Sequence, residues 1–252
     1  MHDKGRLVAR EAERLALARF LEDAASRSAR LLLEGVPGIG KTELWKEGTR
    51  AAQARSYRLV AFRLDDVEAN LGYAALGDLL EPVLDEILLV LQPVRRRALE
   101  AALLRGGGRE AADRGAVSVA VVDGLRALSR SAPVLLALDD LQWLDRSTAQ
   151  VLRFAFRRLE HEPIALLATA RSGEADALLE GLGLTDVERL HVGPLDTEEL
   201  DAVLRSKLDV SFLRSTLQRL HDDSGGNPFF ALELARALLR RAERADSGVL
   251  VA

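Results

Sequence analysis

The chain has 252 residues, 48% of them hydrophobic, and a net charge of −4 at neutral pH. This length and composition can bury a sizeable core, as one large domain or one domain with a small appendage. The absence of cysteine excludes disulfides, zinc–thiolate sites and thiol chemistry. The net negative charge gives no indication of a basic surface that binds nucleic acid. No apolar run approaches the length of a membrane span, and the charged N-terminus lacks an apolar signal segment, so we expect a cytoplasmic protein without a membrane partner.

Hydrophobic periodicity and Gly/Pro punctuation divide the chain into alternating helices and strands. The first part should contain a helix, a strand, a helix, a strand and a long helical region broken at Pro82 and Pro93, over residues 11–28, 30–34, 42–55, 57–64 and 73–105. The second part should contain a helix, a strand, a helix, two strands and three helical segments, over residues 116–129, 133–140, 147–159, 163–170, 189–192 and 197–244. Between these two parts, Gly106-Gly107-Gly108 could be a loop that binds phosphate or a surface connection. Because no Lys-Ser/Thr pair follows the triplet, the connection is favoured.

This alternation predicts an α/β fold: a mostly parallel five-stranded sheet sandwiched by helices, plus a small C-terminal helical lid. Residues 134–138 and 164–168 are apolar throughout, as strands buried on both faces are, so we place them at the sheet centre. The expected division is a core over residues 1–195, with the N-terminal helix and the sheet, and a helical lid over residues 196–252. Ligands of such sheets bind beyond the carboxyl ends of the strands, where the polar motifs described next fall.

A complete phosphate-binding loop of the form GxxxxGK[ST] spans residues 35–42, between a predicted strand and a predicted helix. Its glycines let backbone N–H groups turn inward, and the helix N-terminus adds partial positive charge. Lys41 should reach the β- and γ-phosphates of a nucleotide, and the Thr42 hydroxyl should ligate Mg²⁺. We therefore predict nucleotide contacts along the loop and the residue after it: Gly35, Val36, Pro37, Gly38, Ile39, Gly40, Lys41, Thr42 and Glu43.

An apolar strand that ends in two acids, Asp139 and Asp140, gives a Walker B pattern. Asp139 should hold Mg²⁺, directly or through water, opposite Thr42. Asp140 should polarise the attacking water as general base. Two carboxylates at a buried strand end repel each other, so they suit a site that binds a divalent cation. The alternative, an ordinary solvated loop start, is weakened by the phosphate loop upstream.

The next predicted strand ends in Thr169-Ala170-Arg171. Thr169 should face the γ-phosphate, and Arg171 could stabilise charge on the transferring phosphoryl group; a surface arginine at a strand end is the alternative. Trp143 could stack on a base, but anchoring the loop after the Walker B strand against the core is favoured. The four histidines show no metal spacing.

The ordered motifs resemble those of the signal-transduction ATPases with numerous domains (STAND), a class of P-loop NTPases. More narrowly, they resemble the ATPase module of large LuxR-type transcriptional regulators related to the maltose regulator. The resemblance covers nearly the whole chain and rests on residues 7–14, 35–42, 73–80, 138–145, 168–171, 192–195 and 225–230. It implies that Arg10 lies near the nucleotide, that Pro194 contacts the adenine, and that Asn227 and Pro228 start a lid helix. Ala9 departs from the family, which usually carries glycine before Arg-Glu.

The resemblance implies an ATP-dependent molecular switch that binds ATP or ADP with Mg²⁺ between sheet and lid and hydrolyses ATP slowly. Its partners would be the adenine nucleotide and, through self-association or attachment, regulatory domains. The winged-helix, repeat and DNA-binding domains of the family are not in this sequence, so we expect a fragment or a stand-alone module that does not bind nucleic acid itself. Other functions stay open: a small-molecule kinase, a non-hydrolysing nucleotide-binding adaptor and, less in keeping with the acidic balance, a DNA-translocating motor.

Overall fold

A computed structural model describes residues 8–67, 69, 71–103 and 113–249, with the backbone alone for 242–249. Its strands form a single five-stranded sheet in the order β2-β3-β4-β1-β5, and every neighbouring pair is parallel. The strands are β1 (Ala29–Gly35), β2 (Arg58–Arg63), β3 (Val134–Asp139), β4 (Ile164–Arg171) and β5 (Glu188–His191). The predicted parallel sheet is confirmed, and so is the central position of the two apolar strands, since β3 and β4 lie inside the sheet and are buried almost throughout.

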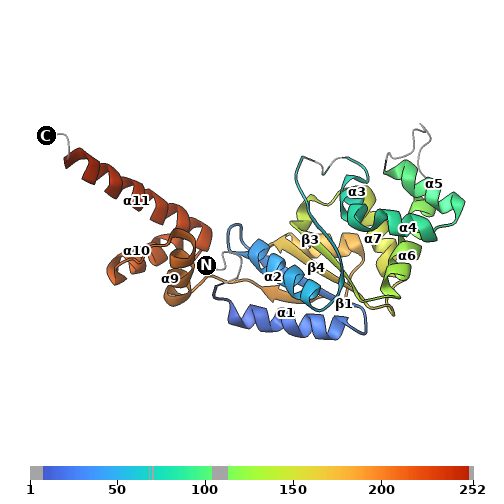
Figure 1. Cartoon of the computed structure of the whole chain (residues 1–252), viewed down its shortest axis with the longest axis horizontal. Coiled ribbons are helices and arrows are strands. Elements are labelled where there is room, and N and C mark those ends of the chain that lie inside the picture. The colour runs from blue at the N-terminus through green and yellow to red at the C-terminus, as the bar shows by residue number, and fades with distance from the viewer. Residues whose placement is uncertain (1–7, 68, 70, 104–112, 250–252) are drawn as a thin grey trace.

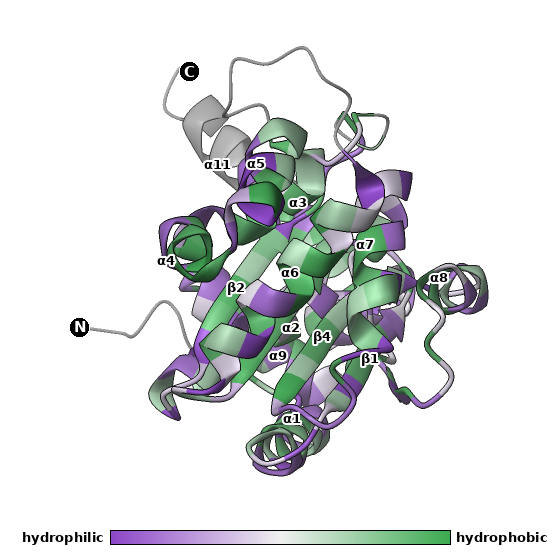
Figure 2. Cartoon of the chain, turned by 90° about the vertical axis from the view of Figure 1, so that its right-hand side faces the viewer, coloured by the Kyte–Doolittle hydropathy of each residue, from purple (hydrophilic) through white to green (hydrophobic). Residues whose placement is uncertain are grey.

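Helices cover both faces of the sheet (Figure 1). Because successive strand residues point to opposite faces, Leu31 and Leu33 of β1 pack on one face, and Leu32 packs on the other. The first face is covered by α1 (Glu11–Ala24) and α2 (Lys41–Ala54). The second face is covered by the helices between β2 and β3 and by α7 (Arg146–Phe156). Figure 2 shows the strands as mostly hydrophobic ribbons enclosed between these helices.

The long helical region after β2 is divided at its prolines, as predicted. It consists of α3 (Ala74–Leu80), a 3₁₀ turn η1 (Glu81–Val83), α4 (Leu84–Val90) and α5 (Pro93–Ala102). Pro82 lies in the turn, and Pro93 is the first residue of α5, where a missing N–H costs no helical hydrogen bond. The predicted connection at Gly106-Gly107-Gly108 lies outside the described residues. The next helix is α6 (Arg114–Ser129), which Asp113 caps and which precedes β3.

Two short elements follow the central strands. The 3₁₀ turn η2 (Leu141–Trp143) comes directly after β3. The helix α8 (Ala175–Leu182), which the sequence analysis did not predict, follows β4 and ends at Gly183 in the left-handed conformation. Its buried residues lie at positions 175, 179 and 182, one helical face, and join the core of the second sheet face.

The last three helices pack together beside the sheet and have a hydrophobic cluster of their own (Figure 1). They are α9 (Thr197–Leu208), α10 (Arg214–Ser224) and α11 (Pro228–Val249), and we call them the lid. A capping box between Asp196 and Glu199 starts α9. The division of the chain after residue 195 stays a prediction; Leu195 already packs in the lid cluster. Within the described residues, no helix combines the length and the apolar character needed to cross a membrane.

Candidate functional site

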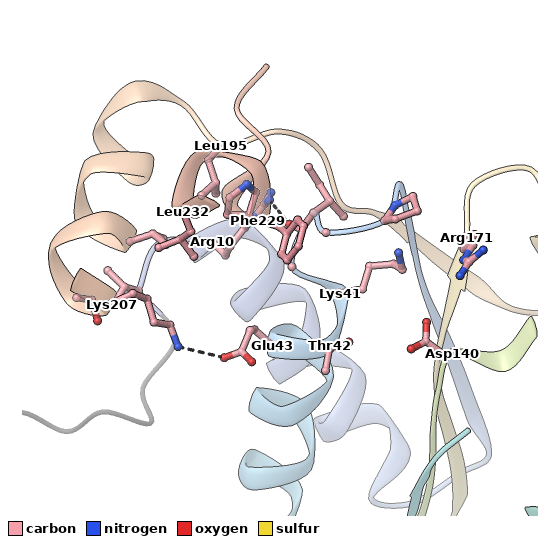
Figure 3. A pocket seen from close by; sticks show the side chains of 18 of the residues that line it. Arg10, Lys41, Thr42, Glu43, Asp140, Arg171, Leu195, Lys207, Phe229 and Leu232 are labelled. Carbon is pink, nitrogen blue, oxygen red and sulfur yellow. Dashed lines mark hydrogen bonds and ion pairs between the residues drawn. The ribbon is translucent and has the colours of Figure 1, made fainter. Parts of the chain in front are cut away.

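A cavity of about 610 Å³ lies at the carboxyl ends of the strands, between the phosphate loop and the lid (Figure 3). Residues 37–43 of the loop line one side of it. Arg63, Asp140 and Arg171, which come from or follow the ends of three different strands, line another side. The lid contributes further residues from α9 and α11, namely Val203, Ser206, Lys207, Pro228, Phe229, Leu232 and Arg236. The predicted location of the site is therefore a real cavity that the core and the lid build together.

The backbone of the phosphate loop needs glycine at three positions. Gly35 ends β1, and a Cβ there would lie 2.8 Å from the carbonyl oxygen of Val192. Gly38 and Gly40 adopt φ values of +78° and +107°, which side chains rarely tolerate. Gly40 caps α2, whose first N–H groups have no partner within the helix. These N–H groups and the helix dipole form a cradle for an anion.

Lys41 lies at the floor of this cradle. Its Nζ donates hydrogen bonds to the carbonyl oxygens of Gly35, at 2.8 Å, and Val36, at 3.1 Å. Gly35 and Val36 do not line the cavity and act through these carbonyls. Burial lowers the pKa of Lys41; Asp140 and Asp139 oppose this shift, whereas the positive charge of Arg171 adds to it. A phosphate in the cradle would offer Nζ charged acceptors, which form stronger hydrogen bonds than carbonyl oxygens do.

Thr169 is placed differently from the prediction. Its side chain is fully buried, its hydroxyl donates to Asp139 Oδ1 at 2.7 Å, and it accepts from the backbone N–H of Asp140 at 2.8 Å. With both interactions made, the hydroxyl does not line the cavity and does not face a γ-phosphate. Thr169 instead fixes the position of both acids at the end of β3.

Asp139 is fully buried, and its Oδ2 atom has no hydrogen-bond partner among the described residues. Burial raises the pKa of Asp139, and the hydrogen bond from Thr169 and the nearby Thr42 hydroxyl partly offset the rise. A buried carboxylate oxygen without a hydrogen-bond partner, next to a threonine hydroxyl, fits a metal ion well. The described residues contain no cluster of three or more His, Cys, Asp or Glu that could hold a metal. Mg²⁺ is commonly bound through one or two protein ligands and the phosphates of a substrate.

Asp140 and Arg171 face the same end of the cavity as Lys41 (Figure 3). Asp140 adopts a left-handed backbone conformation with φ +60°, and its Oδ1 accepts a hydrogen bond from Gln142 Nε2 at 2.9 Å. The guanidinium carbon of Arg171 lies 5.4 Å from the ring centroid of Trp143. Trp143 does not line the cavity; it packs against the core and supports Arg171, in agreement with the favoured anchoring role.

Arg10 joins the N-terminal segment to the loop and to the lid. Its buried guanidinium donates to the carbonyl oxygen of Ile39 at 3.0 Å and to Glu13 at 2.8 Å. Its backbone N–H donates to Glu199 Oε1, in the capping box of α9, at 3.1 Å. Ala9 has φ +72°, a conformation that favours glycine, which accounts for the glycine usual at this position in the STAND proteins that the sequence resembles.

Pro194, predicted to contact the adenine, is exposed and does not line the cavity. It packs against Gly226, where an added Cβ would lie 2.9 Å from its own Cβ. The neighbouring Leu195 takes its place in the cavity wall. Val8, Leu195, Val203 and Leu232 are among the apolar residues of that wall.

Sequence reasoning missed the lid residues of the cavity and a residue at the end of β2. Arg63 ends β2 opposite Asp139 in the strand register, and it lines the cavity. Lys207 of α9 lies 3.8 Å from Glu43 of α2, across the cavity from the acids (Figure 3). Arg63 could have been found in the sequence as a polar residue at the end of a predicted strand. No signal marked Lys207, because its contact joins segments far apart in the chain.

The lid also contacts the phosphate loop directly. Asn227 Nδ2 donates to the carbonyl oxygen of Pro37 at 3.0 Å, and the N–H of Phe229 donates to that of Gly38 at 3.3 Å. A Cβ on Gly38 would lie 2.8 Å from the Cβ of Phe229. Asn227 and Pro228 start α11 as predicted, and the Asn227 side chain caps the helix by accepting from the Phe229 N–H at 3.1 Å.

The family model for the AAA ATPase domain matches residues 6–167. This chain belongs to the AAA ATPase domain family. Its phosphate loop, Walker B acids and most of its sheet lie within the matched residues. The domain is 24% identical over 271 residues to an uncharacterized protein of Rhizobium meliloti (strain 1021), over 95% of this chain and 26% of that protein. The chain thus spans about a quarter of the length of this curated relative.

Solved structures share the fold of this AAA ATPase domain. Cdc6p from Pyrobaculum aerophilum is similar with a TM-score of 0.61 and 19% identity, over 96% of this chain and 63% of that one. AMPPCP-bound DnaA from Aquifex aeolicus gives 0.52 and 18%, over 96% and 68%. A STAND protein with a tetratricopeptide repeat sensor from Pyrococcus horikoshii gives 0.51 and 20%, over 88% and 28%. These similarities establish the P-loop ATPase fold of the chain.

Proposed function

We propose that this AAA ATPase domain is an ATP-binding, slowly hydrolysing switch module of a longer cytoplasmic signal-transduction or transcription-regulating protein. The observation that carries the proposal is the direct contact between the lid and the phosphate loop. Asn227 and Phe229 bond to loop carbonyls, and the same loop forms the floor of the shared cavity. A change in the conformation of the loop would therefore alter the contacts of the first turn of α11.

The residues of the cavity fit ATP with Mg²⁺. The loop amides and Lys41 would hold the phosphates, and Thr42 with Asp139 Oδ2 would hold the metal. Mg²⁺, when bound, neutralises charge on the phosphates and helps to stabilise charge that develops in phosphoryl transfer. The apolar wall of Val8, Leu195, Val203 and Leu232 would take the base. The guanine-specific Asn-Lys-x-Asp motif is absent from the sequence, which favours adenine.

The chemistry assigned to this chain's own residues is limited to positioning, proton transfer and charge stabilisation. Asp140 would accept a proton from the attacking water while its backbone N–H stays bonded to Thr169. Arg171, supported by Trp143, would stabilise negative charge at the cavity end that it shares with Lys41. Slow turnover is proposed as the resemblance to the STAND ATPases implies; in this class of chemistry an arginine finger from another subunit or domain can accelerate turnover.

The role of the lid follows from its contacts. Arg10 connects the loop at Ile39 to the start of α9, and Asn227 connects the loop at Pro37 to the start of α11. Loss of the γ-phosphate would change the loop contacts that both helices share, and the lid would then rotate. Since the chain spans only a quarter of its curated relative, we propose that further domains of a longer protein, or further copies of this module, receive this movement.

Replacing Asp140 with Asn tests this function. We expect the wild-type domain to bind ATP and release phosphate slowly, and Asp140→Asn to bind ATP with little change while phosphate release falls about a hundredfold or more, as for loss of a general base. Phosphate release in single-turnover assays and ATP affinity by calorimetry are the measurements.

The control and the alternative outcomes separate the competing functions. Asp123→Asn, at a residue of α6 that pairs with Arg95 and does not line the cavity, should leave binding and turnover unchanged. Phosphate transfer to a metabolite would instead identify a kinase. ATP binding without turnover in the wild-type protein would identify an adaptor.

A further inference from the structure

We infer that Arg63 is a counter-ion of the acid pair that competes with Mg²⁺ for Asp139, so that it sets how much metal the site needs. The inference rests on the proposed function, because it concerns the metal that ATP would bring. Arg63 is part of neither the phosphate loop nor the Walker B motif. It reaches both acids from the adjacent strand β2, where it is the register partner of Asp139.

The geometry puts Arg63 on the side of the acids that a metal needs. Its Nε lies 3.6 Å from Asp139 Oδ2, and its Nη2 lies 3.6 Å from Asp140 Oδ2. Asp139 Oδ1 is already bonded to Thr169, so Oδ2 is the oxygen left for a metal ligand. The guanidinium and Mg²⁺ would therefore be attracted to the same oxygen, and their positive charges would repel each other.

The contact is also loose enough to be exchanged. Both distances are longer than a hydrogen bond, and the side chain of Arg63 is 62% exposed. A long arginine side chain that is mostly in solvent can turn away from the acids and keep its own charge hydrated. By contrast, Thr169 is fully buried and makes two hydrogen bonds, so it stays with Asp139. Arg63 is thus the charge beside Asp139 that can move.

A second reading of the same geometry makes the opposite prediction. Arg63 lines the cavity, so it could instead bind the γ-phosphate and strengthen ATP binding. The ion pairs of Arg63 with both acids favour competition, because they place its guanidinium beside Asp139 Oδ2 in this structure. Removing a competitor lowers the metal requirement, whereas removing a phosphate ligand weakens ATP binding at any metal concentration.

The test measures ATP affinity by calorimetry over a series of Mg²⁺ concentrations, with chelator at the low end. For Arg63→Gln we expect half of the metal-dependent tightening to occur at a Mg²⁺ concentration about 1.5-fold to fivefold lower than for wild type, the range given by an exposed ion pair. The difference should shrink at high ionic strength. Without nucleotide, Arg63→Gln should unfold at a lower temperature, because two acids lose their counter-ion.

Two matched variants serve as controls. Arg63→Lys keeps the charge and should retain most of the wild-type Mg²⁺ dependence. Arg58→Gln removes an arginine at the other end of the same strand, where it pairs with Glu86, and should leave the Mg²⁺ dependence unchanged. An unchanged Mg²⁺ requirement in Arg63→Gln would overturn the inference. So would a loss of ATP affinity at saturating Mg²⁺ with ADP affinity retained. A wild-type protein that binds no nucleotide would contradict the proposed function itself.

Discussion

Asp139 illustrates, at the residue scale, how a binding residue is costly to the fold. Its carboxylate is fully buried, and burial raises its pKa above the ordinary value of 3.8. Below its ordinary pKa, a carboxyl whose pKa is raised in the folded state is neutral in both the folded and the unfolded protein, so it does not change the free energy of unfolding. The free energy of unfolding falls as the pH rises through the shifted pKa, because the charge then forms without adequate solvation. At neutral pH the domain keeps this cost, and a bound cation would relieve it.

We therefore expect Asp139→Asn to be more stable than wild type at pH 7, by about 0.5–2 kcal/mol. The amide keeps an oxygen for the Thr169 hydroxyl and removes the buried charge. The gain should vanish as the pH approaches 3.8, and the metal-dependent part of ATP binding should be lost. Urea unfolding over a pH series measures the first effect and calorimetry the second. Asp123→Asn should show no such gain, and a less stable Asp139→Asn at every pH would contradict this explanation.

Local motifs made part of the site readable from the sequence. Lys41, Thr42 and Asp139 follow from spacing, because the phosphate loop and the strand end are each continuous in the chain. The hydrogen bonds between Thr169 and the acids could not be predicted, since they depend on how β3 and β4 pair. Arg63 was missed for the same reason: β2 and β3 are neighbours in the sheet although many residues separate them in the chain.

At the scale of elements, the start of α11 is tied to the phosphate loop. Asn227 has two roles with different atoms: Oδ1 caps the helix, and Nδ2 donates to the carbonyl oxygen of Pro37. Arg10 makes a similar connection between the loop and α9. The sequence predicted the helices themselves, through Asn227-Pro228 and the proline breaks in residues 73–105. It could not predict their docking on the loop, because that depends on contacts between distant segments.

The two roles of Asn227 can be separated by substitution. Asn227→Asp keeps an acceptor for the cap and loses the donor to Pro37, whereas Asn227→Ala loses both. We expect Asn227→Ala to lower the free energy of unfolding by about 0.5–2 kcal/mol, with a smaller loss for Asn227→Asp. Both should weaken ATP binding by about threefold to tenfold, as for one lost hydrogen bond. Denaturant unfolding and calorimetry measure these effects; unchanged ATP affinity in both variants would show that the lid contact does not support the loop.

At the scale of the whole molecule, core and lid meet along the cavity. The Lys207–Glu43 ion pair and the Arg10–Glu199 hydrogen bond join them on one side, and Asn227 joins them on the other. Each of these contacts includes a residue that lines the cavity: Lys207 and Glu43, Arg10, and Pro37 as the partner of Asn227. The lid therefore has the contacts needed to respond to what the cavity holds, while its own hydrophobic cluster keeps its three helices together.

This arrangement predicts a nucleotide-dependent movement of the lid relative to the core. Because the chain has no cysteine, Gln53→Cys on α2 and Ser215→Cys on α10 can be labelled with a fluorescent pair without background. Energy transfer between them should differ between ATP and ADP. A second pair within the core, Gln53→Cys with Glu160→Cys, should report no difference. Equal transfer in the first pair for both nucleotides would argue against a switch.

The central claim is that the amides of the phosphate loop and Lys41 hold the phosphates of ATP. The most direct measurement is ATP affinity by calorimetry at saturating Mg²⁺ for wild type, Lys41→Ala and Lys46→Ala. Lys46 lies on the same helix, pairs with Glu43 and does not line the cavity, so its variant should bind like wild type. Lys41→Ala should bind at least about tenfold more weakly, because charge-assisted bonds to phosphate are lost. Equal affinity of Lys41→Ala and wild type, or no ATP binding by the wild-type protein, would contradict the claim.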